Sequence, residues 1–209
     1  MALILAVEHN RIEIVELLLS KPDIDVNLQE VDGLTALMIA SRRGYTKIVE
    51  LLLSRPETDV NLQEVNGWTA LIYTSRYGFT EIVELLLSRS KSVYTSMSET
   101  LTRSTSQRLD INIQDEWEMT ALMRASDYGH VETVKLLLSI PETNVNLRDE
   151  NGRTALMIAS WWGYVEIVKQ LLLRSDIDVN FRGKYGDTAL TLASEKRYVE
   201  IVSLLENHK

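Results

Sequence analysis

The side chains in this chain that are best suited to acid–base or metal chemistry are its three histidines. His9, His130 and His208 lie far apart, and none stands at the spacing of metal ligands or of a nucleophile and its base. The sequence contains no cysteine, which rules out disulfides, thiolate zinc sites and a cysteine nucleophile. His130 follows a glycine, and we interpret it as a structural residue at the start of a helix.

Two pairs of neighbouring carboxylates and the glycines are the other candidates for chemistry. The carboxylate pairs are Asp23/Asp25 and Asp176/Asp178, and they fall in polar turns of an acidic chain, where solvated side chains are expected. No glycine-rich phosphate loop is present. We therefore predict a protein that is not an enzyme, with no metal site and no cofactor, because no acid, base and nucleophile converge.

The composition and net charge of the chain limit the kinds of fold and of binding partner that we expect. The chain has 209 residues, of which 45% are apolar, and no apolar run of 18 residues, so we expect a soluble fold without a transmembrane span. A formal charge of −8 repels phosphate and anionic lipid, which argues against nucleic acid or a membrane as partner. We expect an intracellular, cytoplasmic monomer, which fits the absence of cysteine.

The elements that position these residues repeat along the chain. The tripeptide Thr-Ala-Leu begins at Thr35, Thr69, Thr120, Thr154 and Thr188, and these starts are 34, 51, 34 and 34 residues apart. A partial copy opens the chain, since residues 2–6 lie one period before residues 36–40. The first residues therefore look like a repeat helix rather than a signal peptide. One structural unit written six times predicts a stacked array.

Each period predicts a turn followed by two helices. Thr69 is placed to cap a first helix, and Gly78 can adopt the left-handed conformation that ends it. The second helix, at about 80–88, is apolar around most of its circumference, as expected between two neighbouring units. Pro22, Pro56 and Pro141 then stop the second helix in three copies. No unit can bury its apolar faces alone.

These residues resemble the ankyrin repeat family. The matching motifs are Gly33-Leu34-Thr35-Ala36-Leu37, Gly44-Tyr45, the helix of residues 48–53 and Asp59-Val60-Asn61, and they return in every full copy. The resemblance implies an all-α repeat solenoid of stacked helix-turn-helix repeats joined by β-turn or hairpin loops. It places a single array over 1–209, with repeats at about 1–29 (partial), 30–63, 64–114, 115–148, 149–182 and 183–209 (cap-like).

Several residues depart from the family pattern. Glu118 replaces a turn glycine, Arg197 replaces a helix-ending glycine, and Asn10 stands at the same place in the first copy. Gln170 occupies a leucine position of a second helix, so either a polar residue enters that helix or an extra residue has been placed there.

The third copy is 17 residues longer than the others, and the insertion falls at about 90–108, a segment rich in serine and threonine. Such a composition buries too little apolar surface to order itself well, and a surface loop of this length adds little to the cost of folding. Two other readings are a phosphorylation segment, with Arg89 and Arg103 near Ser92 and Ser106, and a helical extension to Leu101 that contacts a partner.

The resemblance also locates a binding surface. In ankyrin arrays the turn tips and the exposed side of the first helix form a concave surface that binds proteins, and here those positions hold all four tryptophans. The residues implied to contact a partner are Arg42, Arg43, Trp68, Arg76, Tyr77, Trp117, Met119, Asp127, Tyr128, Arg153, Trp161, Trp162 and Tyr185. An alternative is that the tryptophans brace neighbouring repeats.

The charges along this surface suggest the kind of partner. Arg42, Arg43 and Arg76 lie toward one end, so we expect a protein or peptide partner with an acidic segment there and an apolar side over Trp161 and Trp162. Two other functions stay open. The array can be a structural spacer or targeting array in a longer chain. It can also be a substrate of phosphorylation, or of asparagine hydroxylation as the resemblance implies, at Asn27, Asn61 or Asn180.

Overall fold

The computed structural model describes residues 1–91 and 108–208, which form twelve α-helices and no strand. The first six are α1 (Ala2–Glu8), α2 (Ile12–Leu19), α3 (Ala36–Arg43), α4 (Thr46–Leu53), α5 (Ala70–Tyr77) and α6 (Thr80–Lys91). The others are α7 (Ala121–Asp127), α8 (Val131–Leu138), α9 (Ala155–Trp162), α10 (Val165–Leu172), α11 (Ala189–Glu195) and α12 (Val199–Asn207). The predicted all-helical stack of helix pairs is confirmed.

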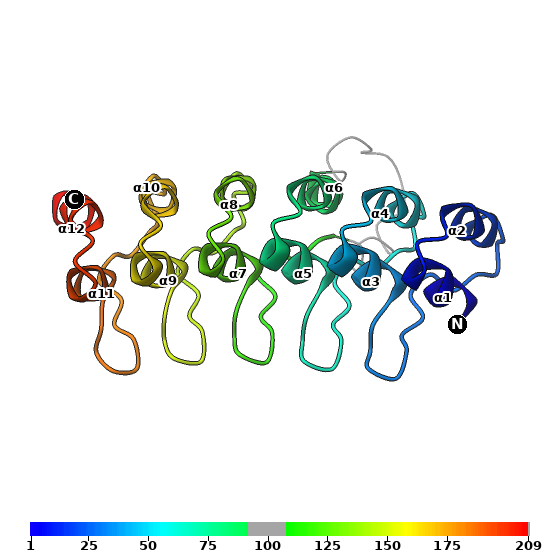
Figure 1. Ribbon diagram of the computed structural model, residues 1–209, viewed down its shortest axis with the longest axis horizontal. Helices are drawn as coiled ribbons and strands as arrows, with labels where there is room; N and C mark the ends of the chain where they lie inside the picture. The colour runs from blue at the N-terminus through cyan, green and yellow to red at the C-terminus, as the bar shows by residue number, and fades with distance from the viewer. Residues whose placement is uncertain (92–107, 209) are drawn as a thin grey trace, which may run out of the picture. The chain divides into compact units, whose positions relative to one another are not determined.

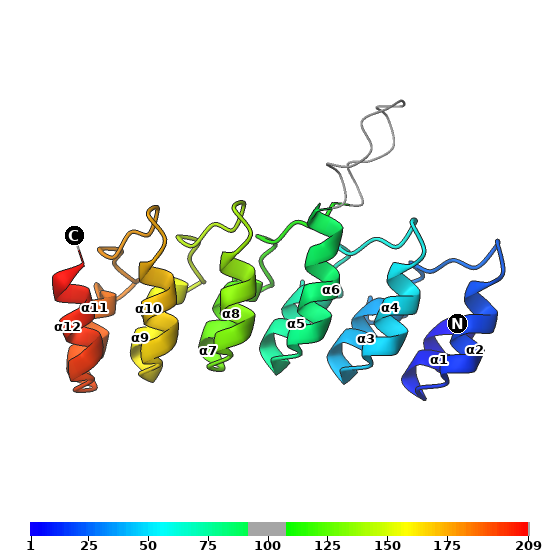
Figure 2. The ribbon, with the colours of Figure 1, turned by 90° about the horizontal axis from the view of Figure 1, so that it is seen from above.

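The helices form two compact units, residues 1–113 (unit 1) and 114–209 (unit 2). In unit 1, α3 packs between α1 and α5, and α4 packs between α2 and α6. In unit 2, α9 packs between α7 and α11, and α10 between α8 and α12. Within each unit the first helices of the pairs form one row and the second helices another, and long turns project from the first row (Figures 1 and 2). The division into six repeats of a single array stays a prediction.

A threonine begins every first helix after the partial copy. The hydroxyl of Thr35 accepts a hydrogen bond from the backbone N–H of Met38 at 3.2 Å, and the threonine itself has extended backbone angles. The same contact recurs at Thr69, Thr120, Thr154 and Thr188. Each hydroxyl satisfies one of the N–H groups that an isolated helix leaves without a partner, which contributes about 1 kcal/mol per cap.

The core of each unit lies between its helix pairs. Ile48 and Leu52 of α4 are fully buried, as are Ile167 and Leu171 of α10. Burying a side chain of this size stabilises the fold by about 1.5–3 kcal/mol. The same two positions are buried in α6, as Ile82 and Leu86, but in α2 Ile14 is 49% exposed. The first helices bring small residues such as Ala40 to the interface, which lets neighbouring helices approach closely.

Arginines join successive repeats at the ends of their second helices. Arg89 donates to the carbonyls of Leu53 and Thr58, at 3.1 and 3.2 Å. Arg55 in unit 1 and Arg174 in unit 2 make the equivalent contacts to the preceding repeat. A cation is favourable at a helix C-terminus because the last carbonyls lack partners there and carry partial negative charge.

Asparagine side chains form a second set of links between repeats. The amide of Asn27 donates to the carbonyl of Glu57 at 2.8 Å and accepts from the backbone N–H of Asp59 at 2.8 Å. Asn61 and Asn146 bridge to the next repeat in the same way. These contacts give two of the predicted hydroxylation sites, Asn27 and Asn61, a structural role, and their modification stays a prediction, as does that of Asn180.

Within residues 1–91 and 108–208, three residues other than glycine adopt left-handed backbone conformations. They are Asn10, Glu118 and Arg197, with φ of 53°, 58° and 61°. They stand where other copies have glycine, so the backbone geometry of the repeat is kept despite the side chain. Gln170 lies inside α10, half-buried, and its amide donates to Glu166 at 2.8 Å. A polar residue has therefore entered that second helix.

The insertion is described only at its edges. Helix α6 runs to Lys91, and the chain is described again from residue 108. Ser92, Arg103, Ser106 and the predicted helical extension to Leu101 lie outside the described residues. Arg89, the other arginine of the proposed phosphorylation segment, has its guanidinium against backbone carbonyls of the preceding repeat.

Candidate binding surface

The candidate surface consists of the side chains at the C-terminal ends of the first helices, which we call the helix-end surface. In unit 1 it comprises Arg42, Arg43, Arg76 and Tyr77, and in unit 2 Asp127, Tyr128, Trp161, Trp162, Glu195 and Lys196. All of these residues are half-buried or exposed. The threonine caps fix where each helix begins, and the left-handed residue that follows fixes where it ends. Equivalent positions therefore recur from one copy to the next.

Glycine at the helix end is required by the neighbouring repeat as well as by backbone geometry. Gly163 follows Trp162 with φ of +80°, and a Cβ there would lie 2.7 Å from the ring of Tyr198. A side chain at this position would displace that ring or distort the turn. The glycine thus lets Tyr198 pack directly beneath the end of α9.

In unit 1 the arginines lie against aromatic rings. The guanidinium of Arg42 is 5.9 Å from the ring centre of Tyr73. That of Arg76 is 5.3 Å from Trp68 and 6.0 Å from Tyr77. Arginine stacks well on aromatic faces, and such contacts hold the guanidinium in place without neutralising its charge. Tyr77 is 46% exposed, so this group presents both positive charge and an aromatic ring to solvent.

Where the residue just before the capping threonine is apolar, its side chain faces inward. Trp68 is 8% exposed and Met119 is 6% exposed, so both are buried beneath their turns, and contact of either with a partner stays a prediction. Trp68 packs on Tyr73, with ring centres 4.9 Å apart, and Tyr73 is itself buried. Burial raises the pKa of the Tyr73 phenol above its ordinary value.

A carboxylate that sequence reasoning missed binds the backbone of these turns. Glu64 accepts hydrogen bonds from the backbone N–H groups of Asn66 and Trp68, both at 3.1 Å. Asp115 and Asp149 do the same in the next two copies. The three carboxylates are buried, and each holds its turn in a folded-back conformation through these bonds. An acidic residue five positions before the capping threonine was the available signal.

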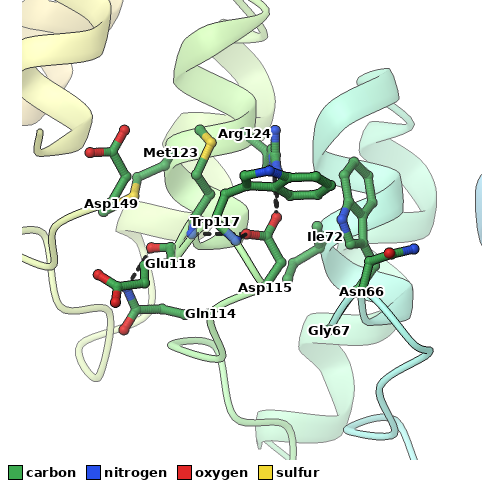
Figure 3. Close-up of polar contacts among 12 residues, drawn as sticks. Asn66, Gly67, Ile72, Gln114, Asp115, Trp117, Glu118, Met123, Arg124 and Asp149 are labelled. Carbon is green, nitrogen blue, oxygen red and sulfur yellow. Dashed lines mark hydrogen bonds and ion pairs between the residues drawn. The ribbon is translucent and has the colours of Figure 1, made fainter. Parts of the chain in front are cut away.

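The turn of the fourth copy also contains a buried ion pair. Arg124 donates from Nε and Nη2 to Asp115 Oδ2 at 3.1 and 2.5 Å, and the two side chains are 8% and 0% exposed. The guanidinium also lies 5.2 Å from the ring centre of Trp117 (Figure 3). Arg124 occupies a position that holds Ile39 and Ile158 in other copies. The sequence prediction did not include it.

The remaining turn residues of the predicted site differ in how far they are available to a partner. The guanidinium of Arg153 is paired with Asp149 at 2.7 Å and is partly exposed. Trp117 is 38% exposed, although its ring lies on Arg124. Tyr185, at the tip of the last turn, is 81% exposed.

In unit 2 the helix-end surface is aromatic and partly acidic. Trp162 is 50% exposed, and its indole N–H donates to Asp127 Oδ1 at 2.7 Å. The Lys196 ammonium lies 3.7 Å from the ring centre of Trp161. Tyr128 stacks on His130, with ring centres 6.3 Å apart. The contacts of Trp162 with Asp127 and of Trp161 with Lys196 join neighbouring repeats, whereas the stack of Tyr128 on His130 lies within one repeat.

The histidines have structural surroundings in this fold. The Nδ1 atom of His9 lies 2.9 Å from the carbonyl oxygen of Leu5, and His130 stacks on Tyr128 at a helix start, as predicted from its position. In the described part of the chain no three histidine, aspartate or glutamate side chains lie close enough together to hold a metal ion. Within residues 1–91 and 108–208, no helix has the length and apolar content needed to cross a membrane.

The capped helix pairs, the turns and the variable helix ends define a class of protein: a helical repeat array that presents a surface of side chains at its helix ends. The family comparison gives the same result. The family model described as ankyrin repeats (3 copies) matches residues 3–98 and 94–183, and the chain therefore belongs to the ankyrin repeat family. Ankyrin repeats generally serve as non-enzymatic modules that bind other proteins.

Solved structures give the same result. The chain is similar to an ankyrin repeat protein named EF0377, with 27% identity, a TM-score of 0.85 and coverage of 100% of this chain and 98% of that one. It is also similar to an ankyrin repeat domain (ABAYE2397) from Acinetobacter baumannii AYE, with 27% identity, a TM-score of 0.82 and coverage of 98% and 95%. No curated protein sequence matches the chain.

Proposed function

We propose that this chain is a non-catalytic interaction module that binds a protein or peptide partner on its helix-end surface. The observation that carries the proposal is the contrast between constant and variable positions of the same helix. Every full copy begins its first helix with Thr-Ala-Leu. The helix ends differ: Arg42-Arg43, Arg76-Tyr77, Asp127-Tyr128, Trp161-Trp162 and Glu195-Lys196. A structural role alone favours the same residue in each copy, so this variation favours recognition.

The chemistry of unit 1 supports an acidic segment in the partner. Among the described residues no carboxylate lies within ion-pair distance of Arg42 or Arg43. The aromatic rings beside Arg42 and Arg76 hold these guanidinium groups in place before a partner arrives. A pre-ordered guanidinium loses less entropy when it pairs with a carboxylate, which strengthens binding.

The chemistry of unit 2 supplies an exposed aromatic group. The indole of Trp162 is half-exposed, and its N–H is already satisfied by Asp127, so a partner can cover the ring without leaving a buried donor unpaired. Tryptophan is among the residues that dominate interface energies, at about 2 kcal/mol or more when it is central and desolvated.

The test compares substitutions on the helix-end surface with matched substitutions on the second helices. A partner captured from the native source is purified, and its affinity is measured by calorimetry for each variant. Arg42→Ala with Arg76→Ala, and separately Trp162→Ala, should each weaken binding at least tenfold. The controls are Lys47→Ala, an exposed cation on α4, and Leu173→Ala, an exposed apolar residue after α10.

Two results would reject the proposal. Unchanged affinity in both helix-end variants, with weakened binding in the controls, would place the interface on the second helices. A native array whose cellular activity survives all four variants would instead favour a structural spacer. The intact mass of the native protein separately tests modification at the asparagines or in the insertion.

A further inference from the structure

The face of Trp161 is covered by a positive charge from the next repeat. Lys196 follows α11, and its ammonium lies 3.7 Å from the centre of the indole ring at the end of α9. At this distance the ammonium is in direct contact with the π face, the arrangement by which aromatic rings bind cations. The contact joins two side chains that are both accessible, since Trp161 is half-buried and Lys196 is exposed.

The surroundings of the ring favour a cation. Asp127 and Glu195 lie on the same helix-end surface of unit 2, at the ends of α7 and α11. The C-terminal ends of α9 and its two neighbours add partial negative charge from carbonyls that lack helical partners. In unit 1 the equivalent positions of α3 and α5 are Arg42 and Arg76, which already supply positive charge, whereas α1 ends at Glu8. The ends of α3 and α5 therefore differ in charge from the ends of α7 and α11.

Lys196 is held loosely enough to be replaced. Within the part of the chain that the structure describes, no carboxylate forms an ion pair with it. Its charge sits on a flexible four-carbon stem and is strongly hydrated, so leaving the ring exchanges one favourable environment for another. An exposed cation–π contact changes an equilibrium by about two- to fivefold, which a partner's side chain can overcome.

We propose that the ring face of Trp161 is a binding position for a lysine or arginine side chain of the partner, and that Lys196 occupies this position in the free chain. The inference rests on the proposed function and sharpens it. An apolar group was expected over this residue, whereas the geometry assigns a cation to Trp161. The partner therefore carries a basic residue for unit 2 in addition to the acidic segment that fits unit 1.

The probe for this position is the capped tripeptide acetyl-Gly-Lys-Gly-amide. Its binding to the full chain is followed by the NMR shift of the Trp161 indole N–H, with ionic strength held constant by sodium chloride. Lys196→Met removes the internal cation and should raise the affinity for the tripeptide about two- to fivefold. Lys196→Arg keeps a cation on the ring and should leave the affinity close to that of the parent chain.

Three controls separate a ring contact from a general effect of charge. The same tripeptide with norleucine in place of lysine should bind about two- to fivefold more weakly, because it lacks the cation. Lys184→Met removes an exposed cation from a turn of the same unit and should change little. The double variant Trp161→Leu with Lys196→Met should not show the higher tripeptide affinity of Lys196→Met. It lacks the same lysine charge but has no indole ring at position 161 to bind the peptide. Its binding is followed by the NMR shift of the Trp162 indole N–H.

The inference is overturned if Lys196→Met leaves lysine-peptide affinity unchanged, or if the norleucine peptide binds equally well. Its failure differs from failure of the proposed function. If substitutions of Arg42, Arg76 and Trp162 weaken partner binding while the tripeptide does not bind at Trp161, the helix-end surface binds the partner without a cation at Trp161. If the tripeptide binds at Trp161 as expected but the substitutions of Arg42, Arg76 and Trp162 leave partner affinity unchanged, the proposed function fails.

Discussion

Replacing Arg124 by isoleucine tests the buried ion pair of the fourth copy. Isoleucine stands at the same helix position in two other copies, as Ile39 and Ile158, both 1% exposed. The substitution therefore fits the helix and its neighbours, and it removes only the guanidinium. What changes is the environment of Asp115, whose carboxylate is fully buried.

The magnitude follows from the hydrogen bonds of that carboxylate. Asp115 accepts two bonds from Arg124 and two from the backbone N–H groups of Trp117 and Met119, the latter both at 3.0 Å. Removing one partner of a buried pair costs about 3–5 kcal/mol. Because the two backbone donors stay, we expect the lower end, about 3 kcal/mol. Adding Asp115→Asn keeps an acceptor for these donors without a buried charge, so the double variant should lose only about 1 kcal/mol.

The assay is urea unfolding followed by far-ultraviolet circular dichroism, with the slope compared among variants to check that the denatured state is unchanged. Arg153→Ile is the matched control, because its pair with Asp149 is more exposed and should contribute about 1 kcal/mol or less. A loss below about 1 kcal/mol for Arg124→Ile, or a double variant less stable than Arg124→Ile, would refute the reasoning.

Three further predictions concern single groups. The hydroxyls of Ser75 and Ser160 are buried with no hydrogen-bond partner among the described residues. Replacing either serine by alanine should therefore leave the free energy of unfolding in urea unchanged or raise it by up to about 1 kcal/mol. The control Thr58→Val removes a hydrogen bond to the carbonyl of Leu52 and should lower the free energy of unfolding by about 1 kcal/mol. Burial raises the pKa of Tyr73, so ultraviolet titration should show this phenol ionising above its ordinary pKa of about 10. The free energy of unfolding should fall as pH rises from the unfolded pKa through the folded pKa, because the folded chain holds the phenol in its neutral form. The variant Tyr73→Phe should not show this loss. The hydrogen bond from Arg174 lowers the pKa of Asp176. The stability from this pair is therefore present above the unfolded pKa of Asp176 and is lost as pH falls through its folded pKa. In the variant Arg174→Met, carbon NMR should show the pKa of Asp176 returning toward its ordinary value, and an unchanged pKa would contradict the pairing.

The fold could be predicted from sequence because its signals are local and repeated. A threonine cap, a helix-ending glycine and an apolar second helix recur with the same spacing, and each depends only on nearby residues. The left-handed conformations of Asn10 and Arg197 followed from the same alignment, since the repeat requires that backbone geometry whatever the residue.

The side chains of the turns could not be placed by the same reasoning. Trp68 and Met119 lie in turns whose folded-back geometry includes hydrogen bonds from their backbone N–H groups to Glu64 and Asp115, and these bonds became visible only in the structure. A lone arginine on the buried side of a first helix, Arg124, was a detectable signal that an acidic partner must lie nearby. Its partner, nine residues earlier, could be assigned only once the turn geometry was known.

The most direct test of the account is photocrosslinking of the native partner from defined positions. A photoreactive phenylalanine is placed at Tyr77 or Trp162 on the helix-end surface, and at Glu84 or Leu173 on the second-helix side as controls. We expect an adduct with the same protein from Tyr77 and Trp162 and none from Glu84 or Leu173. Adducts that form only from Glu84 and Leu173 would contradict it.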